Sequence, residues 1–307
     1  MPFKKILVAL DGSKNSQVAA DYAFWLASTL NAELTGQHVV DPRLVDYFIE
    51  PEFAEELGYS RSVETSEKVF FALRRIGKTI LNIFSQEGLS RGVTTVPVLS
   101  EGYIPEEILQ LSGDFDLLVV GHRGRYEHKL PARVFLGSIA ERLARDSKTP
   151  VLISRQPYRE IKKVLVAFDG SEASIGALLM AENLATMLNL PLRAVTSIAT
   201  PEHHAEAQLM IEKGESFLKQ ESASGVFSIL EGDATETILK EAQQNSLLVV
   251  GAYGYATKEQ NVLGSTTGSI ISRSPSTVLI YRPHTSTTKK QQAVQDSREA
   301  DVVHSVK

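Results

Sequence analysis

The fold is decided by the stretch Lys4–Ser13, which reads KKILVALDGS, and by its near copy Lys162–Ser171, which reads KKVLVAFDGS. In each copy an apolar run continues without a break until Asp-Gly-Ser ends it. Such a run is typical of a strand buried on both faces of a parallel sheet. Ser13 is suited to cap the helix that follows, where apolar residues recur at helical spacing. The stretch therefore predicts a strand, a polar turn and a helix.

A second pair of stretches repeats farther along the chain. Leu117–Gly124 reads LLVVGHRG, and Leu247–Gly254 reads LLVVGAYG. Each copy then closes with Gly-Ser ahead of a last short apolar run. A repeat with so long a period indicates two whole domains and not the short units of a solenoid. We expect domains at 1–156 and 157–283, and a polar tail at 284–307 that is disordered.

Apolar runs and helical patterns alternate in both copies, which predicts crossover connections and a parallel three-layer α/β domain. The expected fold class is α/β, with two tandem open parallel five-stranded sheets, helices on both faces, and a Rossmann-like arrangement. A long amphipathic helix is expected around Val69–Phe84. The expected strands are Ile6–Leu10, Leu34–Val40, Val93–Leu99, Leu117–Val120 and Val151–Ser154 in the first copy, and Val164–Phe168, Leu192–Ile198, Val226–Leu230, Leu247–Val250 and Val278–Tyr281 in the second.

The copies differ by 28 extra residues in the first, which we place between its second and third strands, around Asp41–Arg61. Its apolar character favours a packed helical flap, with a lid over the site or a partner surface as alternatives. The connector Arg155–Lys162 is short, so the domains must lie side by side. Pairing the two fifth strands would remove two open sheet edges and give a pseudo-dimer within one chain.

Composition narrows the classes of function. The chain has 307 residues, a net charge of −5 and no cysteine, so thiolate chemistry and disulfides are excluded. The negative charge gives no reason to expect a nucleic-acid partner. No apolar stretch reaches the roughly 20 residues of a membrane span. We expect a cytoplasmic protein with no membrane partner. His122, His128, His203 and His204 fit no zinc motif and are interpreted as solvated surface residues.

Two polar turns are expected to form a site. Ligands of open parallel sheets bind beyond the carboxyl ends of the strands, where the winding reverses. Asp-Gly-Ser follows strand one, and Gly-x-x-Gly follows strand four and leads to Gly-Ser at a helix start. Glycines let the backbone approach a ligand, and free N–H groups at a helix start attract phosphate oxygens. The pattern favours a nucleoside di- or triphosphate.

The complete pattern resembles the universal stress protein family in its tandem two-domain form. ATP-binding members carry Gly-x-x-Gly, nine residues, then Gly and Ser or Thr, and the second copy has that nine-residue gap, Tyr255–Leu263. The resemblance covers residues 3–156 and 160–283. It implies the strand order 3-2-1-4-5, binding of adenine nucleotide (ATP or ADP, with Mg²⁺ through Asp169 as an option) and dimers formed through the fifth strands, within one chain or between two chains.

Carried over residue by residue, the resemblance implies two nucleotide sites and no catalytic residue. The second-domain site residues are Asp169, Gly170, Ser197, Ile198, Gly251, Gly254, Gly264, Ser265 and Thr266. Their first-domain counterparts are Asp11, Gly12, Val39, Gly121, Gly124, Gly137 and Ser138.

The first domain departs from the pattern, because twelve residues, Arg125–Leu136, separate its two glycine turns. This basic loop would either clamp phosphates with arginine forks or leave a degenerate site. The leading hypothesis is an ATP-binding regulatory protein of the stress response that acts on an unidentified protein partner, with at most slow hydrolysis. The alternatives are an adenylylating or ATP-hydrolysing enzyme of the related α-hydrolase-like group and a nucleotide-free scaffold.

Overall fold

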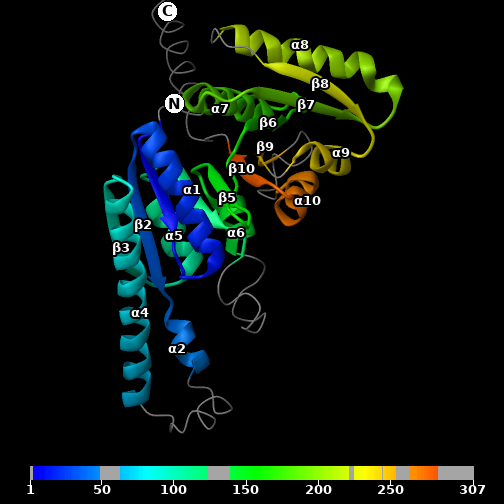
Figure 1. Cartoon of the computed structure of the whole chain (residues 1–307). Coiled ribbons are helices and arrows are strands. Elements are labelled where there is room, and N and C mark those ends of the chain that lie inside the picture. The colour runs from blue at the N-terminus through cyan, green and yellow to red at the C-terminus, as the bar shows by residue number, and fades with distance from the viewer. Residues whose placement is uncertain are drawn as a thin grey trace, which may run out of the picture.

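The computed structural model describes residues 3–48, 63–123, 139–220, 225–243, 245–253 and 263–282. The strands in these ranges form one ten-stranded sheet in the order β3-β2-β1-β4-β5-β10-β9-β6-β7-β8 (Figure 1). Each half has the expected order 3-2-1-4-5 and is parallel within itself. The expectation of two separate sheets is corrected, because the two halves share a single sheet.

The elements follow the repeat. The first half contains β1 (Lys5–Ala9), α1 (Lys14–Leu30), β2 (Glu33–Val40), α2 (Pro42–Phe48), α4 (Val63–Ser90), β3 (Thr95–Glu101), α5 (Ile104–Ser112), β4 (Leu117–Gly121), α6 (Ile139–Asp146) and β5 (Val151–Ser154). The second half contains β6 (Lys163–Ala167), α7 (Glu172–Leu188), β7 (Leu192–Ile198), a 3-10 turn (Pro201–His203), α8 (His204–Gln220), β8 (Val226–Glu231), α9 (Ala234–Glu241), β9 (Ser246–Gly251), α10 (Ser265–Arg273) and β10 (Thr277–Tyr281).

The expected strands are confirmed to within two residues at either end. The largest shift is at β3, which begins at Thr95 and not at Val93. Gly92 has a φ of +67° and follows α4, while the N–H of Val93 donates to the carbonyl of Gly88 at 2.9 Å. This is the hydrogen-bond pattern of a Schellman cap, so Val93 ends the helix before the strand can start.

The seam between the halves is the antiparallel pair β5 and β10, in which Leu152 lies opposite Leu279. The expected pairing of the two fifth strands is confirmed. This pair is antiparallel and all other pairs are parallel, so the strands of the two halves run in opposite directions. The carboxyl ends of the strands in one half therefore lie beside the amino ends of the strands in the other half. A site at the carboxyl ends of one half and a site at the carboxyl ends of the other thus lie at opposite ends of the strands.

Two apolar layers cover the sheet, and each runs through both halves. One layer packs β-strand side chains against α1, α4, α7 and α8, and the other packs them against α5, α6, α9 and α10. The connector after β5 is fixed to the first layer by Tyr22, whose hydroxyl donates to the carbonyl of Arg159 at 2.9 Å and accepts from its N–H at 3.1 Å. The guanidinium of Arg155 crosses the seam and donates to the carbonyl of Ile271 in α10.

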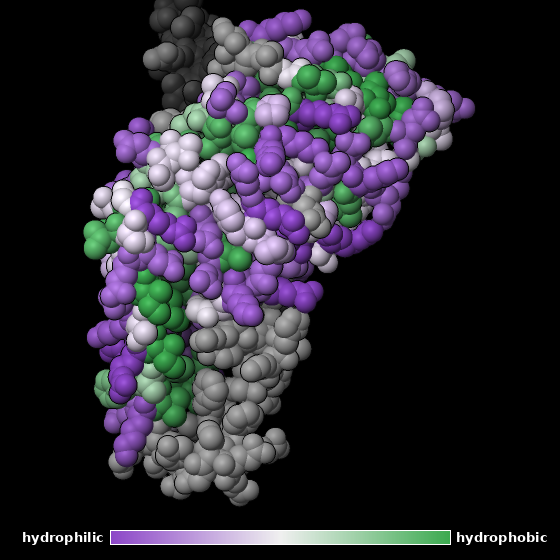
Figure 2. Space-filling model, in the orientation of Figure 1, coloured by the Kyte–Doolittle hydropathy of each residue, from purple (hydrophilic) through white to green (hydrophobic). Residues whose placement is uncertain are grey.

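The extra residues of the first half are only partly where the sequence places them. Part of the insertion is the helix α2, which packs against α4 (Figure 1) and buries Leu44 and Val45. The rest of Asp41–Arg61 from residue 49 onward lies outside the described residues. The helix α4 also absorbs extra length, because it has 28 residues and its counterpart α8 has 17. Figure 2 shows exposed apolar side chains along α4, where Phe71 and Ile83 are more than half exposed.

The glycine that ends β4 or β9 is required by helix packing. A Cβ atom on Gly121 would lie 2.8 Å from the backbone of Asn15, and one on Gly251 would lie 2.9 Å from the backbone of Ala173. Real Cβ atoms do not approach backbone atoms so closely, so the first turns of α1 and α7 can contact the strand end only at glycine. The sequence interpretation assigned these glycines to ligand approach, and helix packing gives a second reason for glycine at both positions.

We expect the seam to be a real part of the cooperative core. Truncating either fully buried leucine, Leu152→Ala or Leu279→Ala, should cost about 2–5 kcal/mol of unfolding free energy, and Leu209→Ala at an exposed position of α8 should change it little. The measurement is urea unfolding followed by circular dichroism. Because the two leucines are direct cross-strand partners, the double variant should show a coupling energy of about 0.5–3 kcal/mol. Simple additivity would contradict the seam.

A pair of glycine variants tests the packing constraint. Gly251→Ala should destabilise the fold by about 1–3 kcal/mol, because the added methyl group meets backbone that has no rotamer to change. The matched control is Gly268→Ala in α10, where a Cβ meets nothing within 4 Å, and it should be neutral or stabilising by about 0.5–1 kcal/mol. Equal effects of the two variants in denaturant unfolding would refute the close-approach explanation.

Candidate functional site

The turn after the first strand has the same geometry in both halves. In the second half the N–H of Ser171 donates to Oδ1 of Asp169 at 3.0 Å, and the N–H of Ser174 donates to the hydroxyl of Ser171 at 3.2 Å. In the first half the corresponding distances, to Asp11 and Ser13, are 2.8 and 3.1 Å. The serine is the expected N-cap, and the aspartate folds the turn back on itself. The side-chain carboxylate of the aspartate is thereby held at the carboxyl end of the first strand of its half.

The opposite wall in the second half is the start of α10. Gly264 is its N-cap residue, and the N–H of Gly264 donates to the carbonyl of Ala252 at 3.2 Å. The hydroxyl of Thr267 donates to the carbonyl of Gly251 at 2.9 Å. These two bonds tie the helix start to the end of β9. The first backbone N–H groups of a helix have no partner within the helix, so they are available to a ligand.

The second half encloses a cavity of about 380 Å³ between these two walls. The structure brings together most of the site residues that the sequence predicts there, namely Asp169, Ser197, Gly251, Gly264, Ser265 and Thr266. Gly170 and Ile198 are outside the lining: Gly170 turns the chain at a φ of +73° under Met210, and Ile198 is buried in the core. Gly254 lies outside the described residues.

The end of β7 contributes a hydroxyl network to this cavity. The hydroxyl of Ser197 donates to the carbonyl of Gly232 at 3.0 Å and accepts from the hydroxyl of Thr237 at 3.0 Å. The hydroxyl of Ser197 is thus oriented by the neighbouring strand end and by α9. A ligand at this end of the cavity would meet a fixed polar group beside the apolar side chains of Val195 and Ile238.

Sequence reasoning missed several residues of the lining. Tyr253 is the clearest, because its ring faces the guanidinium of Arg282 at 4.8 Å and its hydroxyl accepts from that side chain. It lies within the second Gly-x-x-Gly, so the motif itself was the signal. Phe168, at the end of the first strand of this half, also lines the cavity. Thr267 lines it as well, and its hydroxyl was expected beside those of Ser265 and Thr266.

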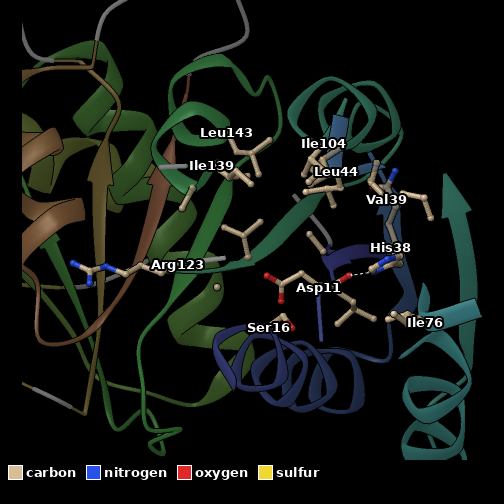
Figure 3. Close-up of a pocket in the computed structure, with 18 of the residues that line it drawn as sticks. Asp11, Ser16, His38, Val39, Leu44, Ile76, Ile104, Arg123, Ile139 and Leu143 are labelled. Atoms are coloured by element: carbon tan, nitrogen blue, oxygen red, sulfur yellow. Dashed lines mark hydrogen bonds between the residues drawn. The ribbon is translucent and has the colours of Figure 1, made fainter. Parts of the chain in front are cut away.

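The first half has a smaller cavity, of about 100 Å³, at the equivalent place (Figure 3). Asp11, Val39 and Gly121 line it, as the sequence predicts. Gly12 does not, because it lines a different groove between α1 and α4. Gly124, Gly137 and Ser138 lie outside the described residues, as does the basic loop Arg125–Leu136 between the two glycines. The imidazole Nδ1 of His38 donates to the carbonyl of Leu10 at 2.7 Å, which fixes the ring in the wall.

His122 is half-buried beside the seam and not a solvated surface residue, which corrects the sequence interpretation. Burial lowers the pKa of His122 to about 4, and the nearby guanidinium groups of Arg155 and Arg123 add to the effect. Burial likewise lowers the pKa of Arg155 to about 10. At neutral pH the imidazole is therefore uncharged beside two cations.

The described ranges support neither a metal site nor a membrane-spanning helix. No group of three or more histidine and acidic side chains is placed to hold a metal ion there. No helix in those ranges is both long and apolar enough to cross a bilayer.

Comparison with known proteins identifies the family. The model of the universal stress protein family matches residues 2–155 and 160–282. A universal stress protein of Synechocystis is 28% identical over 295 residues, covering 91% of this chain and 100% of that protein. One from Mycolicibacterium smegmatis is 25% identical over 295 residues, covering 91% and 97%.

Solved structures agree on the fold. The crystal structure of a universal stress protein from Archaeoglobus fulgidus matches with a TM-score of 0.68 at 20% identity, covering 92% of this chain and 99% of that one. A putative universal stress protein from Pseudomonas aeruginosa gives a TM-score of 0.59 at 16% identity, covering 92% and 94%. With its motifs, topology and family match in two tandem segments, the chain belongs to the universal stress protein family.

Proposed function

We propose that the second half binds an adenine nucleotide, ATP or ADP, and that the protein acts as a nucleotide-dependent regulator. The observation that carries this proposal is that the start of α10 and the carboxylate of Asp169 face the same cavity of about 380 Å³. One wall presents backbone N–H groups and hydroxyls, and the other presents a carboxylate. A ligand with a phosphate end and a hydroxyl-bearing end is complementary to that arrangement.

The polarity of the cavity sets the orientation of the ligand. Phosphate oxygens would lie at the start of α10, where the N–H groups and the hydroxyls of Ser265 and Thr266 donate and the helix dipole favours negative charge. The carboxylate of Asp169 would repel phosphate, so it would meet the ribose hydroxyls. In the alternative arrangement Asp169 would face the phosphates through Mg²⁺, as the one carboxylate ligand of a phosphate-bound ion, and would not contact the ribose.

The base would occupy the remaining end of the cavity. Val195, Ile238 and the side chain of Phe168 offer apolar contact there, and Ser197 holds a fixed hydroxyl at the strand end. The site of the second half thereby has a place for each part of a nucleotide. The resemblance to ATP-binding family members through Gly-x-x-Gly, nine residues and Gly-Ser supports the same assignment.

Binding, and not efficient turnover, fits the side chains best. Efficient hydrolysis needs a general base that is free to take a proton from water. The one carboxylate in the described lining is Asp169, and its Oδ1 is engaged by the N–H of Ser171. We infer that nucleotide binding shifts the population of surface states that a protein partner reads, with slow hydrolysis at most. The partner, a cytoplasmic location and pairing between whole chains stay predictions.

Two variants of the helix start test the site. Gly264→Val should lower ATP affinity by at least about tenfold, because it bars close approach of phosphate to the N–H groups. Thr266→Ile should also weaken binding, because it installs the isoleucine that the first half carries in α6 at the equivalent position, Ile139. The control is Ser272→Val, exposed on the same helix and away from the lining.

Affinity is measured by isothermal titration calorimetry, and co-purified nucleotide by mass spectrometry of the denatured protein. Unchanged affinity in both Gly264→Val and Thr266→Ile would show that the second half is not the main nucleotide site. Loss of affinity in Ser272→Val as well would point to general destabilisation of α10.

A further inference from the structure

The equivalent cavity of the first half lacks three of the hydroxyls that line the second, although Ser16 keeps the hydroxyl that Ser174 supplies in the second half. The halves can be aligned on their structure, since Gly102 donates to the carbonyl of Val40 just as Gly232 donates to that of Ile198. Position by position, Val39 replaces Ser197, Ile104 replaces Ala234, Ile139 replaces Thr266 and Ala140 replaces Thr267. Three of these four exchanges replace a hydroxyl with an apolar group.

The insertion adds further apolar groups to the same cavity. Leu44 of α2 and Leu73 and Ile76 of α4 line it, and the described part of the second-half cavity has no helix in that place. Figure 3 shows Leu44 and Ile104 together on one side of the cavity and Ile76 on another. Arg123 is exposed, and in the same view its guanidinium points away from Asp11. Apart from Asp11, Ser16, Gln37, His38 and Arg123, the side chains of the described lining are apolar, and they offer a polyphosphate few donors.

One exchange places a polar side chain in the first-half cavity where the second half has an apolar one. Gln37 stands in the cavity wall where the second half has Val195, and it is 1% exposed. Its side-chain nitrogen donates to the hydroxyl of Ser100 at 2.9 Å and to the carbonyl of Glu107 at 3.2 Å. A carbonyl can only accept, so the nitrogen must lie on that side and Oε1 on the other. Oε1 is buried and has no hydrogen-bond partner within the described ranges.

We propose that the first half binds an uncharged, ring-sized apolar molecule that carries one N–H or O–H donor, and that this donor pairs with Oε1 of Gln37. A buried acceptor without a partner is costly, so a ligand that supplies a donor gains affinity there. The cavity of about 100 Å³ is lined mainly by apolar side chains, and it approaches the roughly 150 Å³ of an engineered cavity that takes up benzene. The site is thus distinct in ligand chemistry from the second-half site.

The test compares probes that differ only in the donor. Indole and 1-methylindole, and in parallel phenol and anisole, are titrated calorimetrically into the full-length protein with saturating ATP present. Indole and phenol should bind at one site per chain and ATP should not displace them. The methylated probes should bind about five- to a hundredfold more weakly, the range expected when a buried acceptor loses its donor.

Variants locate the binding. Gln37→Val copies the second half and should abolish the preference for indole over 1-methylindole. Leu44→Ala should weaken both probes alike and leave the preference intact, which keeps the test valid if Gln37→Val does not fold. Leu209→Ala, exposed on α8, is the control and should change neither affinity.

Three results would overturn the proposal. They are failure of all four probes to bind, equal affinity for the donor and methylated probes, and one-for-one displacement of indole by ATP. The last would identify the first half as a second nucleotide site. A protein that binds no ATP would contradict the proposed function alone, because the preference between indole and 1-methylindole is measured independently of the second half.

Discussion

Antiparallel backbone pairing between β5 and β10 is the constraint on which the rest of the architecture depends. Each strand is the last of its half, short and apolar, and an open edge of that kind would leave N–H and C=O groups unpaired. Joining them satisfies both edges at once and makes one continuous sheet. Leu152 and Leu279 meet on a shared face, so the apolar layer over that face also continues across the junction.

Much of this fold could be predicted from local patterns, because strands buried on both faces leave an unbroken apolar run between polar turns. The runs at Ile6–Leu10 and Val164–Phe168 give the positions of the central strands, and the serine caps after them give the helix starts. The shifted start of β3 could not be read in the same way. Val93 is apolar, but it serves the cap of α4, and apolar character alone does not distinguish a cap contact from a strand residue.

The candidate site was predictable where the motif names its residues and not where the tertiary structure supplies them. Asp169, Gly264 and Thr266 come from the motif, and all three line one cavity. Leu44 and Leu73 come from an insertion and from a lengthened helix whose path no local pattern fixes. The glycines that end β4 and β9 were predicted for a different reason from the one the packing shows. A glycine that both halves retain indicates that a side chain has no room there, but it does not indicate whether a ligand or a helix occupies the space.

The opposed strand directions at the junction have one more consequence, which concerns access to the two cavities. The two cavities lie at opposite ends of the strands, so the length of the strands separates them. A protein that docked over one mouth would therefore leave the other accessible, and ligands of the two halves would enter and leave by separate routes. Any communication between them must pass through the packed interior and not through steric blockage at a common entrance.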